Sequence, residues 1–150
     1  MRILFISQAI AQNELDQIVS AFPPGSQITF LTGSPVQNPS VEIFQTTKHD
    51  SASLKSRLKC WILYEMEVRK WAASNRDRGF DLIYGISNPP VNAHLGLWLK
   101  KRFGAPFVYM NWDLYPQIIE GTYDNVLVRL VCKFWHLYNS TCYPRIDQMI

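Results

Sequence analysis

The chain has 150 residues, 47% hydrophobic and 18% charged, which excludes an intrinsically disordered protein and suits one globular domain over residues 1–150. The net charge is only +3 and the basic residues form no single tract, so the composition does not support nucleic-acid binding. The cysteines, Cys60, Cys132 and Cys142, include no CxxC pair, which argues against a zinc site and indicates a reducing compartment. No apolar run reaches the ~18 residues of a membrane-spanning helix. We therefore expect cytoplasmic localisation.

Strand-like and helix-like segments alternate along the first half of the chain. Residues 2–7 are predicted to form a first strand and not a signal peptide, and residues 11–22 a helix. A second strand is predicted at residues 27–32, and a short third strand near a sheet edge at residues 41–44. A long helix is predicted over residues 53–75.

Residues 81–116 are predicted to form a strand–helix–strand unit. The nearly all-apolar run at residues 81–86 is typical of a strand that helices cover on both faces. A helix is expected over residues 91–103, and either Ser87 or Asn88 can cap its start.

The end of this helix also has recognisable signals. Basic residues 100–102 lie at its negative end, and Gly104 can take the left-handed conformation just past it. A second strand is predicted at residues 107–110. Parallel strands joined in this way cross over with a right hand, so the loops after both strands leave the same edge of the sheet. Ligands bind at that carboxyl edge in open α/β sheets.

The last part of the chain is predicted to contain a loop at residues 117–124 and a helix at residues 125–143. Residues 144–150 have a proline stop, a polar turn and the first apolar residues of a further strand. We interpret the domain as incomplete at this end. The alternation of strands and helices predicts an α/β fold with a doubly wound, mostly parallel sheet of order 3-2-1-4-5.

In that order, the ligand crevice opens between the loops that follow the first strand and the strand of residues 81–86. Gln8 follows the first of these strands, and Ser87 and Asn88 follow the other. We expect these three residues to bind substrate. The loop at residues 8–12 contains no glycine, which argues against a flavodoxin-like or dinucleotide-binding domain.

Asp113 is the leading candidate for a catalytic residue. It follows the buried strand of residues 107–110 and has Trp112 and Tyr115 beside it. A partly desolvated carboxylate next to a substrate hydroxyl can take its proton, and aromatic rings can pack on the C–H face of a sugar. The alternative is that Asp113 caps a turn before Pro116.

Other polar residues have structural alternatives. His94 lies one turn into its helix, where a hydrogen-bonded core or semi-exposed histidine is the alternative to a catalytic one. Arg129, Lys133 and His136 form one stripe on the later helix. This stripe could meet a phosphate-bearing lipid, or its side chains could reach solvent from the edge of a buried helix.

The long helix has an apolar arc flanked by basic residues. The arc comprises Leu54, Leu58, Trp61, Ile62, Val68 and Ala72. Residues 54–72 could therefore lie on an anionic membrane surface, or the arc could simply pack on the sheet. Glu65 falls within the arc and is placed to pair with Arg69 one turn later.

Three segments together resemble the amino-terminal domain of GT-B glycosyltransferases of family 4, above all the bacterial cell-surface polysaccharide branch. They are the first strand at residues 2–7, the strand that runs into Ser87-Asn-Pro-Pro, and Asn-Trp-Asp113-Leu-Tyr-Pro116. The family typically has Ser-Ser-Pro-Pro and Arg-Asp-Leu-Trp-Pro-Glu at these places. The departures are Asn88, Trp112, Tyr115 and Gln117.

The resemblance implies the amino-terminal half of a two-domain retaining enzyme of hexosyltransferase type. It would move a sugar from a nucleotide-diphosphate sugar, as co-substrate, to a lipid-linked or polysaccharide acceptor. The first domain would supply the acceptor site with Asp113, and a second domain, with a Glu-x7-Glu element absent from this sequence, would hold the donor. No metal or other cofactor is expected.

Two other functions are compatible with the sequence. One is a non-catalytic, membrane-associated acceptor-binding module that recruits a separate catalytic chain, peripheral on the inner face of the membrane. The other is a nucleotide binder of flavodoxin type, against which the glycine-free first loop argues.

Overall fold

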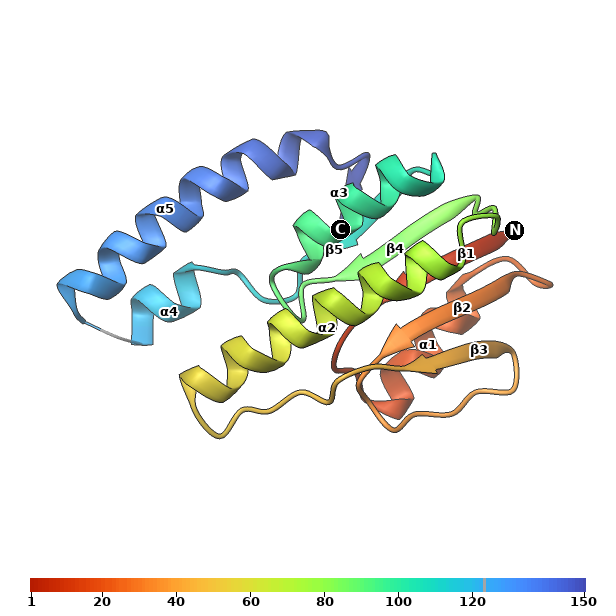
Figure 1. The fold of residues 1–150 in the computed structure, drawn as a ribbon, viewed down its shortest axis with the longest axis horizontal. Helices are drawn as coiled ribbons and strands as arrows, with labels where there is room; N and C mark the ends of the chain where they lie inside the picture. The colour runs from red at the N-terminus through yellow and green to blue at the C-terminus, as the bar shows by residue number, and fades with distance from the viewer. Residues whose placement is uncertain (123) are drawn as a thin grey trace.

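The computed structural model describes residues 1–122 and 124–150, except for the side chain of Leu54 (Figure 1). The predicted loop at residues 117–124 includes Tyr123, which lies outside the described residues, as does the Leu54 side chain of the apolar arc. The strands are β1 (Arg2–Ile6), β2 (Gln27–Thr32), β3 (Val41–Gln45), β4 (Leu82–Ile86), β5 (Phe107–Met110) and β6 (Gln148–Met149). The helices are α1 (Gln12–Ala21), α2 (Leu54–Ser74), α3 (Asn92–Phe103), α4 (Gln117–Thr122), α5 (Val126–Cys142) and the 3₁₀ turn η1 (Tyr143–Arg145).

The six strands form one parallel sheet in the order β3-β2-β1-β4-β5-β6. This confirms the doubly wound α/β fold and the predicted order of the first five strands. The short β6 pairs with β5, so the further strand expected near the end of the sequence is also present. β1 lies at the centre, where Phe5 is in register with Phe30 on one side and Tyr84 on the other.

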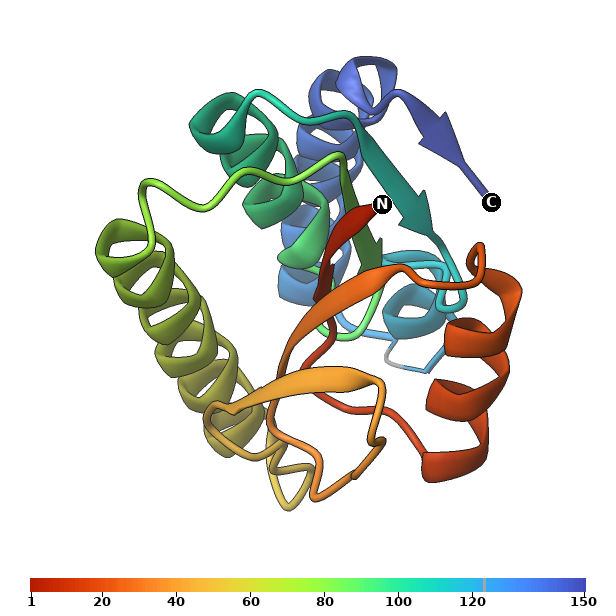
Figure 2. The same cartoon turned by 90° about the vertical axis from the view of Figure 1, so that its right-hand side faces the viewer.

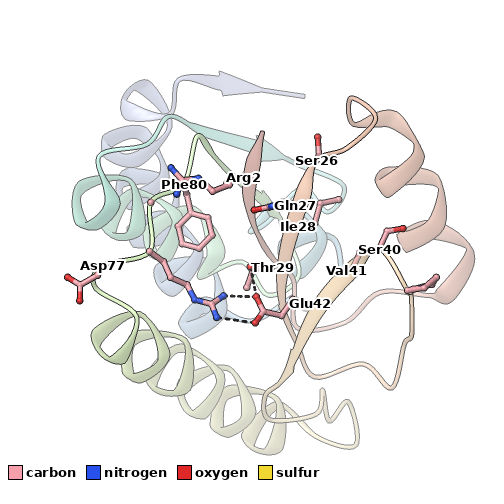
Figure 3. Close-up of a pocket in the computed structure, with 13 residues that line it drawn as sticks. Arg2, Ser26, Gln27, Ile28, Thr29, Ser40, Val41, Glu42, Asp77 and Phe80 are labelled. Carbon is pink, nitrogen blue, oxygen red and sulfur yellow. Dashed lines mark hydrogen bonds and ion pairs between the residues drawn. The ribbon is translucent and has the colours of Figure 1, made fainter.

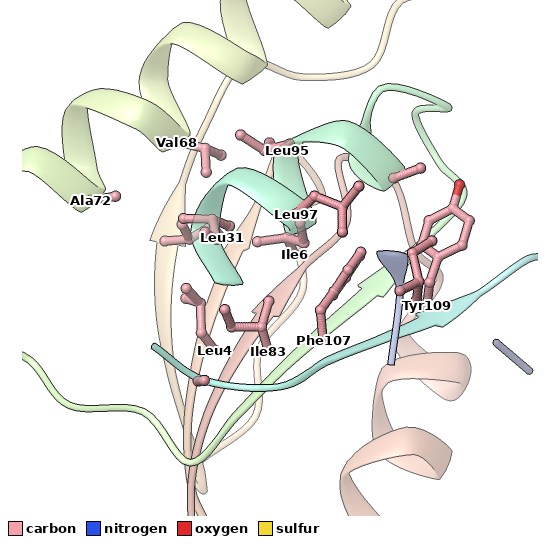
Figure 4. Close-up of a cluster of buried hydrophobic side chains, with 14 of the residues drawn as sticks. Leu4, Ile6, Leu31, Val68, Ala72, Ile83, Leu95, Leu97, Phe107 and Tyr109 are labelled. Carbon is pink, nitrogen blue, oxygen red and sulfur yellow. The ribbon is translucent and has the colours of Figure 1, made fainter. Parts of the chain in front are cut away.

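Helices cover both faces of the sheet (Figure 2), and an apolar core lies between the sheet and the helices on each face. α2, α3 and the end of α5 pack on one face, where Leu4, Ile6 and Phe107 meet buried side chains of the helices (Figure 4). α1 packs on the other face, against Ile3 and Phe5. Alternate residues of the apolar β1 therefore face different cores, as expected for a strand covered on both sides.

The helix termini confirm some of the local signals and correct one. Gly104 ends α3 with a φ of 67°, in the predicted left-handed conformation. α3 begins only at Asn92, so neither Ser87 nor Asn88 caps it. The physical reason is that a residue before a proline is disfavoured in the helical region, and both Asn88 and Pro89 precede prolines.

The segment after β5 also differs from the prediction. Most of the expected loop at residues 117–124 forms the six-residue helix α4, which begins directly after Pro116. Such a short helix has no periodicity to reveal it. α5 follows as predicted, and the Asn125 side chain accepts a hydrogen bond from the Leu127 N–H (2.8 Å) at its start.

Candidate functional site

The loops after β1, β4 and β5 are joined by hydrogen bonds at the carboxyl edge of the sheet. The Gln8 N–H donates to the Asn88 carbonyl, and the Ser87 N–H donates to the Met110 carbonyl, both at 2.9 Å. The Asp113 N–H donates to the Ser87 hydroxyl, also at 2.9 Å. Gln8, Asn88 and Asp113 therefore lie at one edge of the sheet, as predicted, but the groove and the cavity described below are not lined by any of them.

The Asp113 carboxylate is half-buried, and no described residue forms a hydrogen bond or ion pair with it. The turn before Pro116 is closed by the Tyr115 N–H, which donates to the main-chain carbonyl of Asp113 (2.9 Å). The carboxylate therefore does not cap this turn. Trp112, the preceding residue, is 46% exposed. The edge thus presents a carboxylate whose main chain is held by Ser87, and an accessible aromatic ring.

Tyr115 packs away from solvent between two helices. Its ring stacks on Trp135 of α5, with centroids 5.6 Å apart, and meets Trp61 of α2 edge-on. Burial, and next the negative charge of Asp113, raise the pKa of the Tyr115 phenol. The phenol therefore stays protonated and remains a hydrogen-bond donor.

Gln8 has a structural role. Its side chain is fully buried, and its amide nitrogen donates to the carbonyls of Thr47 (3.1 Å) and Cys60 (3.0 Å). These bonds tie the end of β1 to the segment after β3 and to α2. Ser87 is also buried, and its hydroxyl holds Asp113. Both side chains support the edge from within and do not face solvent.

An apolar groove of about 450 Å³ begins next to this edge, at Pro90. Its lining residues come from α2, α3 and α5 and are Glu65, Pro90, Val91, His94, Val131, Phe134, Trp135 and Tyr138. Sequence reasoning missed this groove, although the spacing of the apolar residues at 131, 134, 135 and 138 is that of one helix face. Asp113 is not among its lining residues.

The polar residues of the groove have partners. Glu65 pairs with Arg69 (2.7 Å), as predicted, and the Nδ1 atom of His94 lies 3.9 Å from the same carboxylate. The His94 ring meets the Tyr138 ring edge-on. His94 is therefore a semi-exposed histidine in the groove wall, in agreement with its structural alternative.

The faces that α2 and α5 bury and expose agree only in part with those that the sequence indicated. Trp61, Val68 and Ala72 of α2 are buried against the sheet, so this part of the arc packs on the core as the alternative required. α5 was expected to be largely buried, but most of its large apolar side chains are exposed. The reason is that α5 contacts the core only near its end and along one narrow stripe.

A second cavity, of about 630 Å³, lies at the opposite, amino edge of the sheet (Figure 3). Arg78 donates two hydrogen bonds to Glu42 there (2.5 and 3.0 Å), and the Thr29 hydroxyl donates a third (3.0 Å). These bonds pair Arg78 with Glu42, two of the four charged residues that line the cavity, the others being Arg2 and Asp77.

This ion pair leads to a prediction about acid stability. The hydrogen bonds from Arg78 hold the pKa of the Glu42 carboxyl below its usual range. Stabilisation by Glu42 is therefore complete above the unfolded-state pKa of about 4.3 and is lost as the pH falls through the folded-state pKa. We expect Glu42→Gln to reduce the loss of unfolding free energy on acidification, measured by urea denaturation between about pH 7 and pH 3.

Asp147 is a second carboxyl group that contributes to the loss of stability in acid. Lys100 and the Phe107 N–H hold the pKa of its carboxyl below the usual range, so it gives the same sign of pH dependence. The unfolding free energy of the Glu42→Gln variant should therefore still fall as the pH falls, but less steeply than that of the unaltered chain. A slope equal to that of the unaltered chain would contradict the prediction.

The three cysteines are buried and free, and within residues 1–122 and 124–150 no three His, Cys, Asp or Glu side chains are grouped so as to hold a metal ion. None of the helices described is both long and apolar enough to cross a membrane. Comparison of the sequence with protein-family models and with curated proteins gave no match.

Proposed function

We propose that the chain is the acceptor-binding half of a retaining glycosyltransferase of GT-B type. The observation on which this depends is the Asp113 carboxylate at the carboxyl edge, half-buried, held through its N–H by Ser87 and without a partner among the described residues. A carboxylate in this state can accept a hydrogen bond from an acceptor hydroxyl and orient its oxygen for attack. The exposed ring of Trp112 supports binding of the C–H face of a sugar.

In the proposed reaction, a nucleotide-diphosphate sugar is bound by a donor half. The acceptor hydroxyl attacks the anomeric carbon on the face from which the diphosphate departs, so the anomeric configuration is retained. The bond to the diphosphate breaks, the new glycosidic bond forms, and the hydroxyl proton passes to the Asp113 carboxylate. Asp113 orients the hydroxyl and favours the loss of its proton. Asn88 lies at the same edge, and its carbonyl accepts from both the Gln8 N–H and the Asn92 side chain, so its backbone is fixed.

The second candidate is a non-catalytic acceptor-binding module that recruits a separate catalytic chain at a membrane. The exposed apolar side chains of α2 and α5 favour it, because both helices lie beside the carboxyl edge. This module would bind the acceptor through the same edge. It differs in that Asp113 would then be dispensable for transfer.

The proposal is tested by titrating the chain with a short-chain prenyl-diphosphate hexose and, separately, with a nucleotide-diphosphate hexose. We expect saturable binding of the first ligand and none of the second, because the donor site belongs to the other half. Binding of the nucleotide sugar alone would contradict the proposal. Calorimetry in a detergent below its micelle concentration keeps the acceptor analogue in solution and excludes a contribution from a bilayer.

A further inference from the structure

The exposed large apolar side chains of the described residues are unevenly distributed. Apart from Met1, Met149 and Ile150 at the two ends, all of them lie either between Leu58 and Met66 of α2 or between Trp112 and Tyr138. The described parts of α1 and α3 have none. Concentrated exposure of this kind marks an interaction surface.

α5 contributes the larger part of this surface. Its exposed apolar residues are Val126, Leu127, Leu130, Val131, Phe134, Leu137 and Tyr138. At about 100° per residue they share one arc of about 140°, which borders the stripe that meets the core. Val126 is 82% exposed and Phe134 65%. The sequence of α5 contains no Asp or Glu.

The outer face of α2 combines apolar and basic side chains. Leu58, Ile62, Leu63 and Met66 are exposed on it. Lys55 and Lys59 are exposed between them, and neither forms an ion pair with a described residue. The positive charge of this face is therefore available to a partner.

α2 and α5 flank the same part of the molecule. Glu65 of α2 and Val131 of α5 line the same groove. Tyr115 connects the two helices through its contacts with Trp61 and Trp135. Figure 1 shows the starts of both helices, together with α4, on the side to which the carboxyl ends of β2 and β4 point.

We propose that the outer faces of α2 and α5 dock the chain on an anionic lipid bilayer. Lysine among exposed apolar residues is typical of helices that lie in a membrane interface, whereas the cores of protein–protein interfaces are depleted of lysine. Lys55 and Lys59 supply the attraction to anionic headgroups, and the apolar arc of α5 supplies insertion. On α5, Arg129 and His136 are paired with Asp124 and Glu120, whereas Lys133 is exposed and forms no ion pair with a described residue. Lys133 therefore adds to the free charge that Lys55 and Lys59 supply.

This docking would bring the carboxyl edge to the surface where a lipid-linked acceptor is found, and to that extent it deepens the proposed function. The test is co-sedimentation of the chain with phosphatidylcholine vesicles, with and without phosphatidylglycerol. We expect binding only with phosphatidylglycerol, and weakening by added salt. Lys55→Glu with Lys59→Glu should lower the partition coefficient about 30-fold or more.

The matched control reverses two exposed charges far from this surface, Arg76→Glu with Lys101→Glu, and should retain most of the binding. A second pair, Phe134→Ser with Leu137→Ser, removes apolar area from an exposed face and should weaken binding without lowering the unfolding midpoint. Circular dichroism of every variant verifies the fold.

Equal binding to vesicles with and without phosphatidylglycerol would overturn the proposal. Equal losses of vesicle binding in the two charge-reversal pairs would also overturn it. So would the absence of vesicle binding together with a dimer, detected by light scattering, that dissociates in the variant Phe134→Ser with Leu137→Ser. Vesicle binding without binding of the soluble prenyl-diphosphate hexose would refute the proposed function alone. Binding of the soluble prenyl-diphosphate hexose without vesicle binding would refute the membrane surface alone.

Discussion

Asp113→Asn is expected to lower sugar transfer by at least about 100-fold, because transfer loses the group that orients the acceptor hydroxyl and takes its proton. Asparagine has the same shape and keeps the main-chain N–H that donates to Ser87, so the loop should hold its position. The fold should be unaffected, because the carboxylate forms no hydrogen bond or ion pair with a described residue. Transfer is measured in membranes that contain this chain together with its donor half, supplied with a labelled nucleotide sugar.

Asp77→Asn is the matched control for this experiment. Asp77 has an exposed carboxylate and lines the cavity at the amino edge of the sheet, which is the edge opposite to that of Asp113. The same chemical change there should leave transfer unaltered. If Asp113→Asn retained full turnover, Asp113 would have no part in the site, and the non-catalytic module would become the better explanation.

Gly96→Ala is expected to destabilise the fold by about 3 kcal/mol or more. A Cβ atom at residue 96 would lie 2.0 Å from the Cζ atom of Phe107, and the Phe107 ring is fully buried between α3 and the sheet. The ring cannot move aside without displacing the side chains around it (Figure 4). Urea denaturation gives the change in unfolding free energy.

Two variants make this prediction specific. Gly121→Ala adds the same methyl group to α4, where no described atom beyond the neighbouring residues and the helix's own backbone lies within 4 Å, and should be neutral or slightly stabilising. Gly96→Ala combined with Phe107→Leu should cost less than the sum of the two single changes, because the smaller side chain makes room for the methyl group. Equal effects of Gly96→Ala and Gly121→Ala would contradict the close packing of α3 on β5.

The sheet could be predicted from the sequence because its signals are local. The apolar runs of β1, β2 and β4 are short and have polar or turn residues at their ends, and right-handed crossovers then fix the order. Gly104 was equally predictable, because a glycine after a basic helix end is a strong local signal. The placement of Asp113 at the carboxyl edge follows from β5 alone.

The surroundings of the edge could not be predicted, because they depend on contacts between distant residues. The position of Gln8 just after β1 indicates a ligand group. Its side chain instead donates to the carbonyls of Thr47 and Cys60, which lie 39 and 52 residues away in the sequence. The exposure of α5 depends on how little of it the core covers. A helical pattern identifies an apolar face but does not show what covers that face.

The most direct test of the account is a titration of the chain with the short-chain prenyl-diphosphate hexose, read at each backbone amide by NMR. We expect the largest shift changes at the amides of Ser87 and Asn88 and of residues 111–115, and we expect these changes to be lost in the Asp113→Asn variant. Changes confined to the amino edge, around Thr29, Glu42 and Arg78, would place the ligand at the opposite cavity and contradict an acceptor site at Asp113.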